Sequence, residues 1–192
     1  MIADIYDFDG TVFNGESGSE FYLFCLCHYP SLIKYIPKQI SGLIRYKFFH
    51  KKSFDEMKET FYCFVKGIDA DKAAEKFWYK NADKMNKWFK PKESDVTTVI
   101  CSASPVFQIK PICDLLGVDI VIATNIDPKT GKLSGKNCKN SEKVERIKKE
   151  IPEYEIRDVY TDNVITDLPI LKLATRNKFK VKNGNIEKYE GN

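Results

Sequence analysis

Ile5-Tyr6-Asp7-Phe8-Asp9-Gly10-Thr11 is the stretch that decides the fold of this chain. Two aspartates stand two residues apart after an apolar run, and a strand points residues i and i+2 to the same face. Gly10 and Thr11 would end that strand, so Asp7 and Asp9 would lie together at its carboxyl end, where parallel sheets place their active sites. Two close carboxylates repel unless a cation or a proton separates them. The stretch indicates a divalent-metal site or a protonated acid, although Asp-x-Asp alone more often marks a strand end with two solvated acids.

The composition indicates one globular chain with an unevenly distributed charge. Its 192 residues are 43% hydrophobic, enough for one sizeable core with room for a small second lobe. Residues 15–90 hold 14 Lys or Arg against 9 Asp or Glu, so the excess of the overall +4 charge lies there. The six cysteines include no Cys-x-x-Cys pair, which with only two histidines argues against a zinc site. The chain opens without a signal-peptide pattern and has no apolar run of about 20 residues, so we expect a cytoplasmic location.

The hydrophobic pattern changes twice along the chain. Strands are predicted at residues 2–9, 96–101, 119–123 and 156–161, with a hairpin strand at 132–137 and an edge strand at 179–181. Helices are predicted at 105–116, 141–151 and 167–174. Residues 15–90 are predicted to be helical, with breaks at Pro30, Pro37, Gly42 and Gly67, caps at Ser53 and Asp69, and Pro91 as their end.

This order predicts an α/β fold with a doubly wound, mostly parallel sheet. Residues 1–14 and 91–192 would form the α/β core. Residues 15–90 would form a small all-helical cap domain, inserted after the first strand.

Polar side chains follow each predicted strand of the core. Ser102 and Ser104 come after the second strand, at the start of a helix, where a hydroxyl and free N–H groups bind anions or simply cap the helix. Asp162 and Asp167 follow the strand that ends at residue 161, and either acid alone could be a turn or cap residue. Lys143 lies in the helix between these sites, where most lysines are solvated. Together with the opening aspartate pair, the set indicates phosphoryl transfer by a nucleophile, a metal and donors for phosphate oxygens.

These residues resemble a known family. Four ordered motifs are similar to those of the haloacid dehalogenase superfamily: Asp7-Phe-Asp9-Gly-Thr11, Ser102-Ala-Ser-Pro, Lys143 and Asp162…Asp167. Ile100-Cys-Ser-Ala-Ser-Pro, Leu115-Leu-Gly-Val-Asp119, Thr130-Gly-Lys-Leu-Ser-Gly135 and Asp167-Leu-Pro-Ile-Leu171 resemble its phosphoserine-phosphatase-like branch. That branch carries a helical cap between the first and second motifs, so the resemblance implies a Rossmann-like core with the cap at residues 15–90.

The resemblance also implies roles for individual residues. Asp7 would be the nucleophile that forms an aspartyl-phosphate, and Asp9 would act as general acid and then as general base. Lys143 would neutralise charge on the phosphate and the nucleophile. Ser102 and Ala103 would hold the phosphate.

Gly10 and Thr11 would add to the phosphate site. A Mg²⁺ cofactor would be bound by Asp7, the backbone carbonyl of Asp9, Asp162 and Asp167, because oxygen ligands with retained waters suit this ion.

The substrate is less well defined than the chemistry. Glu16 stands nine residues after Asp7, where phosphoserine phosphatases use a glutamate to bind the substrate's amino group; a solvated acid at a helix start is the alternative. Their cap arginine corresponds to Phe61 here, which argues against L-phosphoserine. Arg45 is the one arginine of the cap and therefore a candidate for substrate binding.

The cap also suggests a partner. Residues 21–54 contain six Lys or Arg, nine Phe or Tyr and no acidic residue. A packed helical hairpin with solvated lysines accounts for this, but so does weak contact with an anionic membrane surface. The expected activity is a Mg²⁺-dependent phosphatase acting on a small phosphomonoester. Alternatives are a lipid-headgroup phosphatase, a phosphotransferase and a phosphate-binding module without catalysis. No nucleic-acid-binding motif is present, so nucleic acid is not an expected partner.

Overall fold

The computed structural model describes residues 1–90 and 95–191 and contains a six-stranded sheet in the order β3-β2-β1-β4-β5-β6. Strands β1 (Ile2–Tyr6), β2 (Thr97–Pro105), β3 (Ile120–Thr124), β4 (Glu155–Thr161) and β5 (Asn177–Lys182) run parallel, and β6 (Asn185–Lys188) is antiparallel to β5. The prediction of a mostly parallel α/β fold is confirmed. The opening stretch supplies the central strand, which places its carboxyl end in the middle of one sheet edge.

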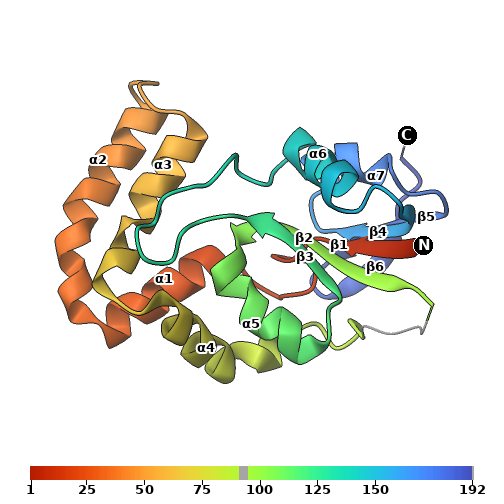
Figure 1. Cartoon of the computed structure of the whole chain (residues 1–192), viewed down its shortest axis with the longest axis horizontal. Helices are drawn as coiled ribbons and strands as arrows, with labels where there is room; N and C mark the ends of the chain where they lie inside the picture. Colours follow the sequence, from red (N-terminus) through yellow and green to blue (C-terminus); the bar gives the residue numbers. More distant parts are fainter. Residues whose placement is uncertain (91–94, 192) are drawn as a thin grey trace.

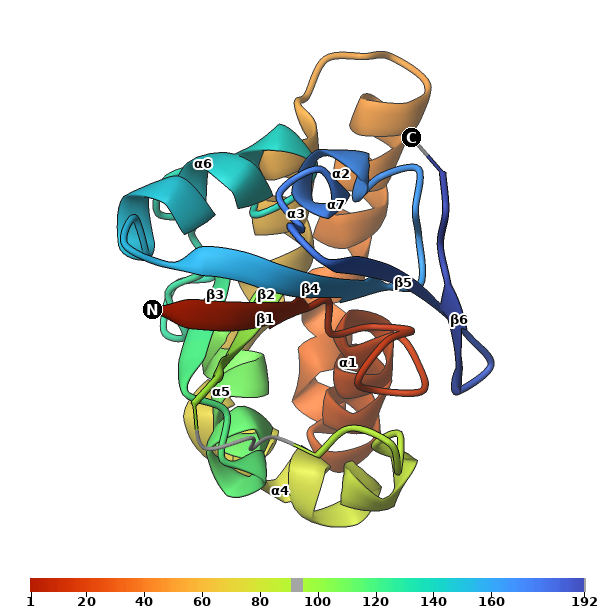
Figure 2. The same ribbon diagram turned by 90° about the vertical axis from the view of Figure 1, so that its right-hand side faces the viewer.

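Helices cover both faces of this sheet. Helices α4 (Ala70–Asn81) and α5 (Val106–Leu116) lie on one face, and α6 (Ser141–Glu150) and α7 (Leu168–Leu171) lie on the other (Figures 1 and 2). Successive residues of β1 face opposite sides of the sheet. On one side, Ile5 belongs to the apolar cluster under α6 and α7. Phe8, just beyond the strand, belongs to the cluster under α5. This double covering explains why β1 (IADIY) and β3 (IVIAT) are mostly apolar.

The cap consists of the helices between β1 and β2. Those that lie beyond the carboxyl ends of the strands are α1 (Ser17–His28), the 3-10 helix η1 (Pro30–Tyr35), α2 (Ile36–Lys47), α3 (Phe54–Phe61) and the 3-10 helix η2 (Tyr62–Gly67) (Figure 1). The others are α4, which lies on a face of the sheet beside α5, and the 3-10 turn η3 (Ala82–Lys84). The capping box that begins α3 is confirmed, because Ser53 Oγ accepts from Glu56 N (3.1 Å) and Glu56 accepts from Ser53 N (2.7 Å). Asp69 caps α4 as predicted, through Lys72 N (3.1 Å).

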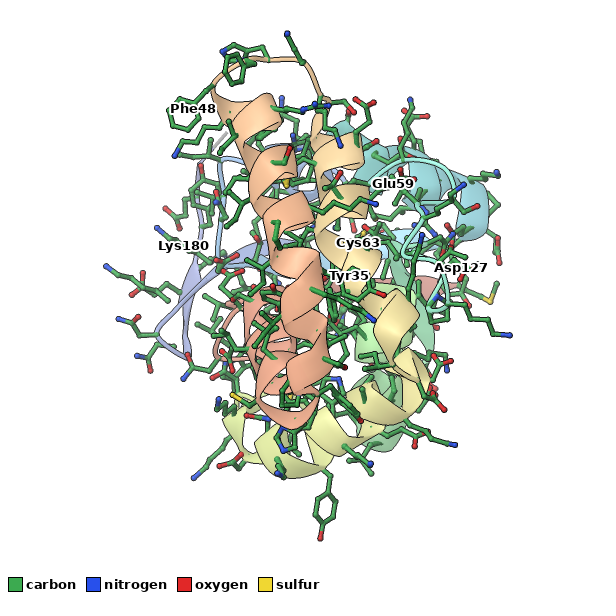
Figure 3. The ribbon with its side chains drawn as sticks, turned by 90° about the vertical axis from the view of Figure 1, so that its left-hand side faces the viewer. Tyr35, Phe48, Glu59, Cys63, Asp127 and Lys180 are labelled. Carbon is green, nitrogen blue, oxygen red and sulfur yellow. The ribbon has the colours of Figure 1, made fainter. Side chains whose placement is uncertain are left out.

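The base of the cap shares one hydrophobic cluster with the α/β core. Phe21 of α1 and Trp78 of α4 pack in the same cluster as Phe107 of α5. Trp78 Nε1 also donates to the carbonyl of Gln108 (2.5 Å). Only α2 and α3 project away from the sheet as a hairpin (Figures 1 and 3). The cap boundaries at residues 15 and 90 stay a prediction.

Several predicted elements differ from the structure. Residues 132–137 form no strand, since hairpin pairing there is limited to one bridge between Ile126 and Leu133. Gly42 does not break a helix but lies within α2, where a Cβ would approach Thr60 Cγ2 to 2.4 Å. The predicted helix from residue 53 to 66 ends at Phe61 and continues as η2.

Two other differences concern the segment that follows α4 and the last strand of the sheet. The helix predicted to reach residue 89 ends at Asn81, and β6 was not predicted. Pro91, predicted to end the helical block, lies outside the described residues. Within the part of the chain that the structure describes, no helix is long and apolar enough to cross a membrane.

Candidate active site

A polar cleft of about 170 Å³ lies at the carboxyl ends of β1, β2 and β4, facing the cap. Sequence motifs far apart in the chain meet there. Its lining residues are Asp7, Asp9, Glu16, Ser102, Ala103, Lys139, Lys143, Asp162, Asn163, Thr166 and Asp167. The structure therefore brings together the predicted aspartates, the serine, the alanine, the helix lysine and Glu16.

Asp7 lies beside a buried lysine that bridges two carboxylates. Lys143 Nζ donates to Asp7 Oδ1 (2.7 Å) and to Asp167 Oδ2 (3.0 Å), and its side chain is only 3% exposed. Burial raises the pKa of Asp7 to about 7, with Asp167 adding to the rise and Lys143 opposing it. The two carboxylates raise the pKa of Lys143 above its usual range despite its burial, so the ammonium stays charged. Asp167 also accepts the Thr161 hydroxyl (2.8 Å), which fixes its orientation.

Asp9 is held by the cap and the core at once. Its Oδ1 accepts the backbone N–H of Ser17 (2.7 Å), in the first turn of α1, and its Oδ2 accepts the hydroxyl of Ser104 (2.6 Å). The Ser17 and Ser104 hydroxyls are themselves 3.0 Å apart. The sequence does not predict these partners of Asp9, because the pattern around Ser104 is that of a helix cap and Ser17 carries no motif. The contacts fix the carboxylate that the resemblance gives the acid–base role.

The second motif lies at the end of β2, not at the first turn of a helix. Pro105 is the N-cap residue of α5, and the strand register shifts between Ser102 and Pro105. Ser102 is only 1% exposed, and its Oγ accepts a hydrogen bond from Ser104 N (3.0 Å). The predicted helix-cap role of these serines is therefore wrong, while the Ser102 hydroxyl proton is left to donate into the cleft.

A cap lysine reaches this same segment. Lys58 Nζ of α3 donates to the carbonyl of Ala103 and to Asn137 Oδ1 (2.5 Å). The single hydroxyl proton of Thr124 is shared between the same two oxygens, which lie 2.7 and 3.0 Å from Thr124 Oγ1. Burial lowers the pKa of Lys58 to about 8, although the Asp9 charge opposes this. Lys58 was missed from the sequence because no local pattern distinguishes it from the solvated lysines around it.

Gly10 and Thr11 shape the cleft without lining it. Thr11 is buried, and its hydroxyl accepts from Asp162 N (2.8 Å). Gly10 has a φ of +70°, and a Cβ there would lie 2.6 Å from Asp162 Oδ2. Gly10 N donates to the carbonyl of Gly15 (3.0 Å) and is not available to a phosphate. The structure thus gives both residues the role of positioning Asp162, rather than the predicted role of binding phosphate.

Of the two cap residues predicted to bind the substrate, the structure places one in the cleft and the other outside it. Glu16 lines the cleft, where burial and the charges of Asp9 and Asp162 raise its pKa. Arg45 is exposed on α2 and is not among the cleft-lining residues, so the structure does not bring it to the site. Lys139, which was not predicted, supplies a positive charge on the cleft wall instead.

The charge of the cleft fits a cation. The lining side chains comprise five carboxyl groups and two ammonium groups, which leaves three negative charges at full ionisation. Burial and the charge of Asp167 raise the pKa of Asp162, as expected for an acid whose neighbours are also acidic. Among the described residues no three His, Cys, Asp or Glu side chains form a ready metal-binding cluster. The donors suit an ion that keeps several waters, as Mg²⁺ does, better than one enclosed by protein ligands.

Comparison with known proteins agrees with this architecture. The fold is similar to that of a protein of unknown function from Bordetella pertussis Tohama I (TM-score 0.69, 17% identity, 91% of this chain and 87% of that chain). It is also similar to a phosphoserine phosphohydrolase-like protein from Francisella tularensis subsp. tularensis SCHU S4 (0.57, 19%, 93% and 86%). An apo phosphoserine phosphatase matches as well (0.58, 17%, 92% and 84%).

At these identities the likeness concerns the fold, and it confirms the Rossmann-like arrangement implied by the resemblance. No curated protein sequence matches the chain. The family model described as haloacid dehalogenase-like hydrolase matches residues 5–172, which include all four motifs, and the chain therefore belongs to that family.

Proposed function

We propose that the protein is a Mg²⁺-dependent phosphatase that hydrolyses a small phosphomonoester through an aspartyl-phosphate intermediate. The observation that carries the proposal is the pairing of Asp7 with the buried Lys143 in a cleft where carboxyl groups outnumber ammonium groups by five to two. A buried ammonium next to one carboxylate is suited to binding a phosphoryl group beside a nucleophile, because it neutralises charge that gathers on both.

In the first step a carboxylate oxygen of Asp7 attacks phosphorus as the bond to the alcohol oxygen breaks. Asp9 gives its proton to that oxygen, and the neutral alcohol leaves. Ser102 donates its hydroxyl to a phosphoryl oxygen, and Lys143 offsets the negative charge of the phosphoryl group. The short contacts of Asp9 to Ser17 N and Ser104 Oγ hold it in one orientation, which acid catalysis requires.

In the second step a water molecule attacks the aspartyl-phosphate. The Asp9 carboxylate takes a proton from this water, inorganic phosphate is released and the Asp7 carboxylate is restored. One group thus serves as acid and then as base, as in other two-step displacements.

The residues that would hold Mg²⁺ are Asp7, Asp162 and the backbone carbonyl of Asp9. Asp167, already bonded to Lys143 and Thr161, would orient this set or contact a metal-bound water. When bound, the ion would offset the charge of the carboxylates and of the phosphoryl oxygens.

The cleft favours a small substrate. Its volume of about 170 Å³ is below the range of roughly 300–1,000 Å³ of sites for drug-sized ligands, so it suits a phosphoryl group with a short polar alcohol. Glu16 offers an anionic partner for an amino group and Lys139 a cationic partner for an acidic group.

L-phosphoserine is not the substrate that we propose. Phe61, at the position expected for a carboxylate-binding arginine, packs on Tyr22, Tyr62 and Phe64. We also propose a reducing, cytoplasmic location, since all six cysteines are free.

Hydrolysis of p-nitrophenyl phosphate and of a panel of phosphorylated metabolites, with Mg²⁺ and with EDTA, tests the proposal. We expect Mg²⁺-dependent release of phosphate and a loss of about 10⁴-fold or more in Asp7→Asn. Asp114→Asn, on the exposed face of α5, is the matched control and should keep full activity. A folded wild-type protein that hydrolyses none of these compounds would favour a phosphate-binding module. Product analysis with added alcohols separates hydrolysis from transfer to another acceptor.

A further inference from the structure

The outer face of α2 and the turn after it leave apolar side chains in solvent. We call residues 33–52 the α2 surface. Its exposed apolar residues are Ile33 (59% exposed), Ile40 (52%), Leu43, Ile44, Phe48 (71%) and Phe49 (61%). Four of them follow the helical spacing i, i+3, i+4 and i+8, which places them along one side of α2. Monomeric proteins rarely leave such a contiguous apolar face without a partner.

The opposite side of α2 accounts for its packing within the cap. Gln39 and Gly42 are buried, and Gly42 approaches Thr60 of α3 so closely that a Cβ would clash. The exposed apolar side chains are therefore not left over from the contact with α3. They form a second face of the same helix, and α2 is the outermost helix on that side of the molecule (Figure 1). Phe48 lies near the end of α2, at the tip of the hairpin (Figure 3).

The α2 surface is also strongly basic. It carries six cations, Lys34, Lys38, Arg45, Lys47, Lys51 and Lys52, and residues 21–54 contain no acidic residue. None of these six makes an ion pair within the described residues. Two of them lie over aromatic rings, with Lys34 Nζ 5.3 Å from the centre of the half-buried Tyr35 ring and Lys51 Nζ 5.8 Å from that of the exposed Phe49 ring.

We propose that the α2 surface binds to membranes that contain anionic phospholipids. A helix of 12 residues is about 18 Å long and would lie in the plane of the interface. Ile40, Ile44 and Phe48 would enter the boundary between headgroups and acyl chains, and the lysines would meet anionic headgroups. The contact is peripheral, and it does not depend on the activity proposed for the cleft.

Charge complementarity selects this partner over the others that an apolar face could accept. A second copy of the chain would bring six further cations against the same six, and like charges oppose such a contact. Nucleic acid would satisfy the cations but would leave the isoleucines and phenylalanines exposed. An anionic bilayer satisfies both sets at once.

Flotation of the full chain with lipid vesicles tests the proposal. We expect the protein to float with vesicles of phosphatidylcholine and phosphatidylserine at low salt, to be released at high salt, and to stay unbound with phosphatidylcholine alone. A double variant, Phe48→Ser with Phe49→Ser, should bind at least about tenfold more weakly. A triple variant, Lys38→Gln, Arg45→Gln and Lys47→Gln, should lose about 100-fold.

Two single-residue controls carry changes of the same chemical kind outside the α2 surface. Leu115→Ser, at a residue 75% exposed on α5, and Lys76→Gln, exposed on α4, should bind vesicles as wild type does. All variants should keep the circular dichroism and the phosphatase activity of wild type towards a soluble phosphomonoester. The absence of wild-type flotation at low salt would overturn the proposal. So would equal losses in the controls, or a dimer in solution that Phe48→Ser dissociates.

Discussion

Replacing Lys143 by methionine would remove the cation that is buried between Asp7 and Asp167. The lysine is 3% exposed, and the carboxylates that it joins are 13% and 4% exposed. Methionine fills a similar volume but leaves two acids facing each other without a counter-charge. Breaking a buried ion pair by removing one partner costs about 3–5 kcal/mol. We expect the free energy of unfolding to fall by about that amount at pH 8 in EDTA.

Urea unfolding followed by tryptophan fluorescence measures this change, since Trp78 and Trp88 are both in or near the core. Lys110→Met is the matched control, because it removes a lysine from an exposed ion pair. The Lys110 side chain is 51% exposed and that of its partner Asp114 is 55% exposed. Such surface pairs contribute less than about 1 kcal/mol. EDTA is essential, since a bound cation would take over part of the lysine's role.

The pH dependence of stability provides a second test of the contact between Lys143 and Asp7. The pKa of Asp7 is raised from 3.8 to about 7 in the folded protein. Between these values the folded state keeps a proton that the unfolded state has released, so stability falls as the pH rises through this window. Without Lys143 the pKa rises further, so the deficit of Lys143→Met should be largest at pH 8 and smaller at pH 5. A deficit equal to that of Lys110→Met, or one that does not change with pH, would refute the buried ion pair.

Three further changes test other parts of the site. Gly10→Ala places a Cβ 2.6 Å from Asp162 Oδ2 at a φ of +70°, and we expect a loss of about 1–3 kcal/mol in thermal unfolding; an unchanged melting temperature would contradict the close approach. Ser104→Ala removes the 2.6 Å hydrogen bond to Asp9, so kcat should fall roughly 10–100-fold with little change in KM, and a wild-type kcat would show that the hydroxyl does not position the acid. Lys58 has a pKa of about 8 and should lose its charge above that pH, weakening its hold on the core, so activity should decline there; Lys58→Arg should move the decline to higher pH, and identical pH–rate profiles would exclude this role.

The predicted core strands and the residues at their ends could be found from sequence because their signals are local. Apolar runs identify the strands, and parallel strands bring residues that follow them to one sheet edge, as for Asp7, Ser102 and Asp162. The same reasoning gave the capping box of α3, since Ser53 and Glu56 are only three residues apart. That these distant motifs lie close together in space follows from the parallel topology of the sheet. No sequence pattern links one motif to another.

The errors concern contacts between distant segments and polar strands. In the predicted hairpin strand at 132–137, pairing is confined to the bridge at Leu133, where Asp127 N donates to Lys132 O (2.9 Å) and Ser134 N to Asn125 O (2.8 Å), while Leu133 N donates to Glu59 of α3 (2.9 Å). Strand β6 is exposed throughout and lacks the apolar alternation that marks a strand. The prediction for Arg45 rests on residue type alone, while Lys58 reaches the core because α3 packs over the second motif.

The two hydrogen bonds to Asp9 join the chemistry to the position of the cap. One donor, Ser17 N, belongs to the cap, and the other, Ser104 Oγ, belongs to the core, so the carboxylate is fully held only when α1 is seated against β2. A displaced cap would leave Asp7 and Lys143 in place, since both lie in the core, but would free the carboxylate that we propose as the proton donor. In the proposed mechanism, proton transfer by Asp9 is thus conditional on the seating of α1, and a substrate that holds α1 against β2 would promote its own cleavage.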